Sequence, residues 1–253
     1  MLREWKTEWM KVRRKKIALV PAAFLLFTFL WISWAIRSAR MESNEENWKW
    51  LLMCLGLINT LLMPTMIDMI ASRLCDVELK GNTLKLLCTM EQKGRLFDMK
   101  ILTGAVYVGG YVAAELVMML IFARLHGFAG GMTQRHLMCF LLQSGFVSLG
   151  VLLVQMLLSL FSVNQILPLA VGLAGSFLGL FSWFLSSPLW RPVVWAYYNL
   201  LGYIGQNWDE STRIVSYYEV PVDWSAVITL LVVLPLGYIL GRQLFIRRTP
   251  GCD

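Results

Sequence analysis

The segment RLCDVELKGNTLKLLCTMEQKGRLFDMK, residues 73 to 100, is the only long charged segment in a stretch that otherwise has the composition of membrane spans. It contains six basic residues, and a basic loop between two hydrophobic spans is normally retained on the cytoplasmic side. We therefore expect this loop to be cytoplasmic. Its position then sets the direction in which every other span crosses the membrane.

A short helix is predicted within this loop. Gly81 interrupts the chain, and Asn82 is a favourable N-cap. Leu84, Leu87 and Cys88 then recur at helical spacing. The pattern indicates an amphipathic helix lying beneath the membrane, and the alternative that the spacing leaves open is a solvated connector.

The composition is that of a polytopic membrane protein. The 253 residues are 57% hydrophobic and only 15% charged, with 11 tryptophans. A soluble domain of this length would carry closer to a quarter charged residues. The expected fold is therefore an all-α transmembrane domain that comprises the whole chain, residues 1–253.

The net charge of +7 could suggest binding to nucleic acid, but its distribution argues against this. Of the 23 basic residues, 16 precede Ile17, lie in the loop at 73–100, or follow Gly241. The expected topology places all of them on one side of the membrane. This is the positive-inside pattern of a membrane protein, and we expect no nucleic-acid partner.

Six spans are predicted, with both termini in the cytoplasm of a cell membrane. Residues 1–16 are expected to form an amphipathic helix that lies in the lipid headgroup plane. The hydrophobic residues of the outer segment at 188–223 are not continuous enough to form a membrane span, yet the segment is too apolar for a free loop. We therefore expect it to be interfacial or re-entrant. The spans are expected at about 17–36, 50–71, 101–123, 137–161, 166–187 and 224–241.

Two kinds of resemblance to a known family then emerge. The run Glu78-Leu-Lys-Gly-Asn-Thr83, followed by Leu86-Leu87, Arg95 and Lys100-Ile101-Leu102, resembles the first cytoplasmic loop of ABC-2 type transporter permeases, although Asn82 separates Gly81 from Thr83. The amphipathic start, basic loop and outer segment before the last span also match that layout. The length and the opening EWMKVRRKK at 8–16 most resemble lantibiotic immunity and bacitracin-resistance permeases.

The resemblance implies that a separate ABC ATPase, in two copies, docks under the 73–100 loop. ATP and Mg would be bound by that partner, with no cofactor in this chain, and a second permease chain, identical or homologous, would complete the transporter. For Glu78 and Thr83, helix capping is an equally good interpretation. The residues expected to couple the ATPase to the spans are Glu78, Gly81, Thr83, Leu84, Leu87 and Cys88.

Catalytic motifs are missing from the sequence. It contains no GxxxxGK[ST] that could cradle a nucleotide, and no HExxH or GxSxG. The five cysteines form no CxxC pair, and we expect neither a disulfide nor a zinc site. His126 and His136 have no evident third ligand, so we interpret them as interfacial. We therefore expect no enzyme and no metal site.

One acidic residue, Glu115, is expected deep within the third span, where an unpaired carboxylate would be costly. It should be protonated or hydrogen-bonded, and Gln143, Ser144 and Ser148 of the fourth span are the candidate partners. The cluster is either a structural tie between two spans or part of a substrate or proton path. Asp68, one turn from the cytoplasmic end of its span, is expected to reach water.

Small residues predict where helices pack closely. Gly109 and Gly110 in the third span, and Gly175-xxx-Gly179 in the fifth, are patterns that let backbones approach each other. We expect two permease chains to pair through Gly175 and Gly179.

The sequence leaves two functions of different classes open for this chain. The first is the permease of an exporter that expels an amphipathic substrate, such as a lantibiotic, from the membrane. The second is a non-transporting sensor or scaffold that binds a ligand at its outer aromatic segment. Co-purification with a P-loop ATPase would favour the permease, and co-purification with a kinase or regulator would favour the sensor.

Overall fold

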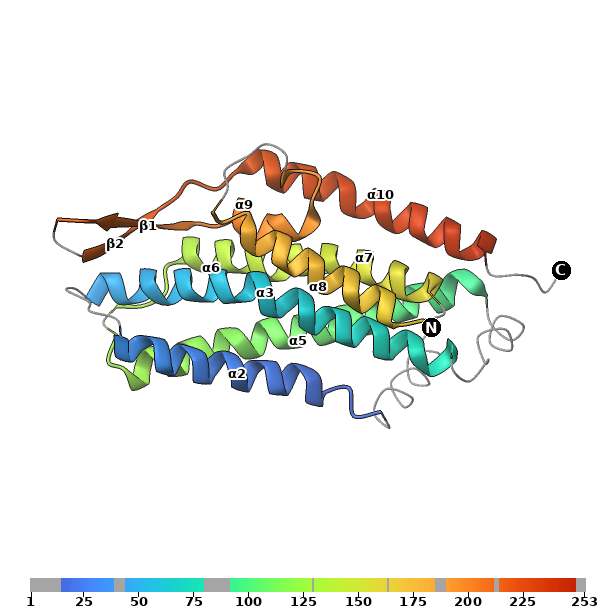
Figure 1. Cartoon of the computed structure of the whole chain (residues 1–253), viewed down its shortest axis with the longest axis horizontal. Coiled ribbons are helices and arrows are strands. Elements are labelled where there is room, and N and C mark those ends of the chain that lie inside the picture. Colours follow the sequence, from blue (N-terminus) through green and yellow to red (C-terminus); the bar gives the residue numbers. More distant parts are fainter. Residues whose placement is uncertain are drawn as a thin grey trace.

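The computed structural model of the chain describes residues 15–38, 44–79, 92–128, 130–162, 164–184, 190–211 and 214–248. It is a bundle of long helices from which a two-stranded β-hairpin extends (Figure 1). Within a bilayer, a helix satisfies its own backbone hydrogen bonds, and this explains why the uncharged runs of the chain are helical. The predicted, mainly helical fold is confirmed, whereas the hairpin was not predicted.

Within the described ranges, four of the helical regions are long and apolar enough to cross a membrane, and two further apolar helices, α2 and α8, are shorter. The count of six spans therefore stays a prediction. Both α3 and α5 extend beyond the expected span limits at the end where they meet the basic loop. The regions are α2 (Leu19–Ala35), α3 (Asn44–Leu79), α5 (Lys93–Leu125), α6 (Gln134–Phe140) continuing through a π-helical turn (Leu141–Phe146) into α7 (Val147–Phe161), α8 (Ile166–Phe181) and α10 (Trp224–Arg248).

The central helix of the bundle is α3, which packs against α2, α5, α7 and α8. In its most apolar stretch 67% of the residues are buried, compared with 22% in α10. Met63, Met66, Ile67 and Ile70 of α3 are inaccessible to solvent and belong to one continuous core. By contrast, α10 runs along one edge of the bundle, where it contacts α5 and α7 (Figure 1).

The two ends of the bundle differ in chemistry. At one end α3 ends, α5 begins and α10 ends (Figure 1). Because Lys93, Arg95, Arg242 and Arg247 lie here, we name it the basic end. The β-hairpin extends from the opposite end, which we name the hairpin end (Figure 1).

The segment expected to be interfacial or re-entrant has a different structure. A 3-10 turn (Val194–Ala196) leads into the one-turn helix α9 (Tyr197–Leu200), which packs against α3 and α8. Strands β1 (Ile204–Asp209) and β2 (Ile214–Glu219) then pair antiparallel. The aromatic rings of α9 are buried inside the bundle, where Tyr198 is 0% exposed. Whether this segment is interfacial or re-entrant in the membrane stays a prediction.

Two predicted features cannot be compared with the structure. Residues 1–14, which make up most of the expected amphipathic helix, lie outside the described residues. So do residues 80–91, which contain the helix predicted within the basic loop.

Candidate functional site

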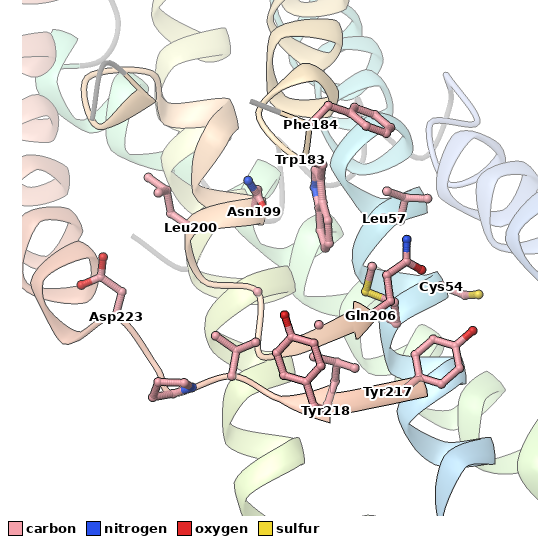
Figure 2. Close-up of a pocket in the computed structure, with 16 residues that line it drawn as sticks. Cys54, Leu57, Trp183, Phe184, Asn199, Leu200, Gln206, Tyr217, Tyr218 and Asp223 are labelled. Atoms are coloured by element: carbon pink, nitrogen blue, oxygen red, sulfur yellow. The ribbon is translucent and has the colours of Figure 1, made fainter. Parts of the chain in front are cut away.

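A cavity of about 660 Å³ opens at the hairpin end, between α3, the end of α8, α9 and the β-hairpin. Its volume falls within the range of small-molecule binding sites. Figure 2 shows the side chains around it, with Trp183 and Phe184 on one side and Tyr217 and Tyr218 on the other. The remaining lining residues are Met53, Cys54, Leu57, Asn199, Leu200, Gly202, Ile204, Gly205, Gln206, Val220, Pro221 and Asp223.

Hydrogen bonds fix the inner wall of this cavity. The indole nitrogen of Trp183 donates to Thr60 Oγ1 of α3 at 3.0 Å. The side-chain amide of Asn199 donates to the carbonyl oxygen of Ser182 at 2.6 Å. These two bonds join the end of α8 to both α3 and α9, so the aromatic wall has a defined position.

The β-hairpin forms the outer wall of the cavity, and polar contacts attach it to the start of α6. Glu219 of β2 forms a hydrogen-bonded ion pair with Arg135. Its other carboxylate oxygen lies 3.1 Å from Nε2 of His136. On the facing strand, Gly205 pairs with Tyr218, whose ring covers the glycine. The hairpin therefore forms the outer wall of the cavity.

The lining combines aromatic faces with amide and carboxylate groups, and among the described residues no lysine or arginine belongs to it. Burial raises the pKa of Tyr217 to about 12, so its hydroxyl group stays neutral well above ordinary pH. The hydroxyl of Ser225 and the backbone N–H groups of Ser225 and Ala226 lower the pKa of Asp223. Such a lining suits a molecule with both apolar and polar parts.

A layer of buried polar side chains lies beneath the cavity. The side-chain amide of Gln143 donates to the carbonyl oxygen of Tyr198 at 2.6 Å. The hydroxyl groups of Ser148 and Tyr198 lie 2.7 Å apart. Gln143 and Ser144 lie within the π-helical turn, and π-helical turns occur frequently at functional sites.

Glu115 also lies in the interior, as predicted, and its carboxyl group is fully buried. However, neither of its oxygens has a hydrogen-bond partner among the described residues. The side chain of Asn59 interacts with it electrostatically, and Asn59 itself donates to Ser144 Oγ at 3.2 Å. The candidate partners Gln143, Ser144 and Ser148 instead form hydrogen bonds with Tyr198 and Asn59. That Glu115 is protonated or hydrogen-bonded stays a prediction.

Sequence reasoning missed the two residues that organise this layer, Asn59 and Tyr198. Asn59 is a lone amide in an apolar span, and this signal could have been recognised. Tyr198 lies in a segment expected to be interfacial or re-entrant, and nothing in the pattern singles out this tyrosine from the other aromatic residues there. Because Asn199 and Leu200 line the cavity, α9 connects the cavity directly to the polar layer.

The predicted packing glycines lie in the interior of one chain. A side chain at Gly175 would overlap the ring of Trp195, and a Cβ atom at Gly179 would lie 2.8 Å from the carbonyl oxygen of Trp195. Their close contacts are thus intramolecular, and they are not available for pairing two chains. A Cβ atom at Gly109 or Gly110 would have no neighbour within 4 Å among the described residues.

Asp68 is buried and does not reach water as expected, because its carboxyl group packs against Gly172 of α8. Both carboxyl oxygens lack a hydrogen-bond partner in the described part of the chain.

The residues expected to contact an ATPase fall largely outside the described residues. Glu78 belongs to the last turn of α3. The other five are outside the described ranges: Gly81, Thr83, Leu84, Leu87 and Cys88.

The two histidines lie in different surroundings. His126 stacks on Phe122, whereas His136 contacts Glu219. Within the described ranges, no group of three or more His, Cys, Asp or Glu side chains is arranged to hold a metal ion.

Comparison with known proteins identifies the family. A family model with the description ABC-2 family transporter protein matches residues 5–179, which is more than half of the chain and includes α2 to most of α8. No curated protein and no solved structure matches the chain. The membrane-spanning helices agree with this match. The chain is a member of the ABC-2 family of transporter proteins, a multi-pass membrane protein with a role in transport that works with an ATPase subunit.

Proposed function

We propose that this chain is the permease subunit of an ABC exporter that expels an amphipathic substrate, a lantibiotic or a similar antimicrobial peptide, from the membrane. A separate ATPase, in two copies and with bound ATP and Mg, drives the transport. A second permease chain, identical or homologous, completes the transporter. The function is self-immunity or resistance to the peptide.

The observation that carries the proposal is the cavity of about 660 Å³ at the hairpin end, with its aromatic walls and polar groups. Rings such as Trp183 and Tyr218 offer large apolar contact areas to an amphipathic molecule. The amides of Asn199 and Gln206 offer hydrogen bonds. In the proposed topology the basic end faces the cytoplasm, and the cavity therefore opens near the outer leaflet, where such a substrate accumulates.

A resistance assay tests this function. Cells that produce the permease and its ATPase are challenged with a panel of lantibiotics and with bacitracin. Tyr218→Ala removes a half-exposed ring from the cavity wall, whereas Trp208→Ala removes an equally exposed ring from the same hairpin outside the cavity. We expect Tyr218→Ala to lower resistance and Trp208→Ala to retain it. Equal resistance in the two variants would show that the ring of Tyr218 in the cavity wall takes no part in resistance, and it would contradict the proposed role of the cavity.

The alternative is a sensor that binds a ligand in the same cavity without transporting it. A cavity alone does not distinguish binding from transport. Purification of the tagged permease from membranes distinguishes the two hypotheses, because only the permease hypothesis requires an ABC ATPase in the preparation. A preparation that contains a kinase or regulator and no ATPase would favour the sensor.

A further inference from the structure

A cluster at the basic end joins the start of α5 to the end of α10. The hydroxyl group of Tyr238 donates to Asp98 Oδ1 at 2.6 Å, and Nε of Arg242 donates to the same oxygen at 2.9 Å. Phe97 supports the cluster, since its ring lies 5.7 Å from that of Tyr238 and 5.8 Å from that of Phe245. We name Asp98, Tyr238 and Arg242 the basic-end joint.

This joint lies next to the predicted ATPase-facing loop. Helix α5 begins at Lys93, directly after residues 80–91, and Asp98 is less than two turns into it. The guanidinium group of Arg242 occupies the space beside Gly94, where a side chain would overlap it. The joint thus lies within the first turns of α5, close to the predicted loop.

The two helices that border residues 80–91 are also connected to each other. Lys100 of α5 is 1% exposed, and its ammonium group donates to the carbonyl oxygen of Leu74 in α3 at 3.1 Å. A carbonyl near the end of a helix is a favourable site for a cation. This bond connects the first part of α5 to the last part of α3.

At its other end, α10 reaches the cavity. Asp223 precedes the first residue of α10 and lines the cavity. Its Oδ1 accepts hydrogen bonds from the backbone N–H groups of Ser225 and Ala226, at 2.9 and 3.2 Å. The helix continues from Trp224 to Arg248 through Pro235. One continuous helix therefore has the cavity at one end and the joint at the other.

The seam between α10 and α7 consists of small residues facing leucines. Cβ atoms at Gly237 and Gly241 would lie 3.2 and 2.6 Å from the Leu153 and Leu157 side chains, respectively. Apart from this seam and its contacts with α5, α10 is mostly exposed, and it is the least buried of the four long apolar helices in the described ranges.

We propose that the basic-end joint transmits ATP-driven movement of the loop to α10, and that α10 carries this movement to the outer cavity. Asp98, Tyr238 and Arg242 are positioning residues in this account, which rests on the proposed function of the cavity. The ion pair is partly exposed, with 38% and 29% of the Arg242 and Asp98 side chains accessible. Such pairs contribute little to stability, so its variants are expected to fold.

The experiment uses the permease with its ATPase in lipid nanodiscs. The five native cysteines are replaced by serine or alanine, and Gln206→Cys places a single thiol on the cavity wall. The labelling rate of this thiol by a membrane-impermeant maleimide is compared with and without trapping by ATP and vanadate. With an intact joint we expect trapping to change the labelling rate.

Arg242→Gln breaks the ion pair, and Arg247→Gln is the matched control, because Arg247 is exposed on the last turns of α10 outside the joint. We expect Arg242→Gln to lose the response to trapping, although the ATPase still co-purifies, and Arg247→Gln to keep it. The charge swap Asp98→Arg with Arg242→Asp should restore the response. A purely structural role would instead lower the melting temperature without a specific loss of the response.

The labelling experiment distinguishes a failure of the proposed function from a failure of the joint alone. If the parent protein shows no change on trapping, the cavity takes no part in the cycle, and the proposed function fails together with the joint. If the parent and Arg242→Gln respond equally, or if the charge swap does not restore the response, only the joint is wrong.

Discussion

At the scale of single residues, the contact between Asp68 and Gly172 defines how closely α3 and α8 pack. The carboxyl group of Asp68 fills the space that a side chain at position 172 would occupy. One turn further along, Thr65 Oγ1 and Ser176 Oγ are 3.4 Å apart, so polar contacts continue along the same seam. Glycine at 172 is required here by the close approach of a neighbouring side chain.

Gly172→Ala should therefore lower the stability of the protein, by about 1–3 kcal/mol for an overpacked interior position. The measurement is the melting temperature of the purified permease in detergent. Gly109→Ala is the control, since a Cβ atom there would have nothing within 4 Å in the described structure, and alanine favours the helix. The double variant Asp68→Ala, Gly172→Ala should recover part of the loss. Equal melting temperatures for Gly172→Ala and Gly109→Ala would contradict the steric argument.

Asp223 determines where α10 begins. Asp223→Ala should destabilise the start of the helix by about 0.5–2 kcal/mol, the usual cost of losing an N-cap, whereas Asp223→Asn should be tolerated. Hydrogen bonds to Ser225 and Ala226 lower the folded-state pKa of this carboxyl group. Its stabilising contribution is therefore present above the ordinary pKa of an aspartate and is lost as the pH falls through the lowered value. Hydrogen exchange at residues 224–228 measures the effect, and equal protection in the two variants would refute it.

At the scale of elements, the β-hairpin gives the cavity its outer wall, and its shape depends on Gly205. A Cβ atom at this position would lie 2.5 Å from the ring of Tyr218 on the facing strand. Valine favours strands in general, so a valine here would keep the hairpin but displace the ring.

Gly205→Val should weaken substrate binding while the fold is retained. Binding of a lantibiotic to the purified permease, measured by titration, should show a Kd raised about tenfold, equivalent to about 1.4 kcal/mol. Asn207→Val is the matched control, because Asn207 lies on the same strand outside the cavity. The same Kd for the two variants would show that the ring of Tyr218 does not contribute to the site.

The helices could be predicted from the sequence because membrane helices depend on local composition. A run without charges must satisfy its backbone internally, whatever its neighbours are. The hairpin could not be predicted in this way, because its place is set by distant partners: Glu219 binds Arg135 and His136 of α6. For the same reason, the sequence identified Glu115 as buried but did not show that Asn59, a lone amide on another helix, lies beside it. Small-residue patterns predicted close packing at Gly175 without revealing that Trp195 fills the space.

At the scale of the whole molecule, coupling to the ATPase is expected to depend on the predicted helix in the 80–91 region. Apolar residues at the centre of an interface commonly provide most of its binding energy, whereas charges at the rim provide little. Leu87→Asp should therefore release the ATPase from the purified complex and abolish resistance, although the permease still inserts. Lys85→Ala, two residues away on the charged side, should have little effect. Retention of the ATPase by Leu87→Asp would mean that the loop is a solvated connector.

The central claim is that an amphipathic peptide leaves the membrane through the hairpin-end cavity at the expense of ATP. The most direct measurement follows a fluorescently labelled lantibiotic in proteoliposomes that contain the permease–ATPase complex. We expect the peptide to be cleared from the bilayer only when ATP is supplied, with clearance lost in Tyr218→Ala and retained in Trp208→Ala. Clearance that does not require ATP, or that is equal in the two variants, would contradict the account.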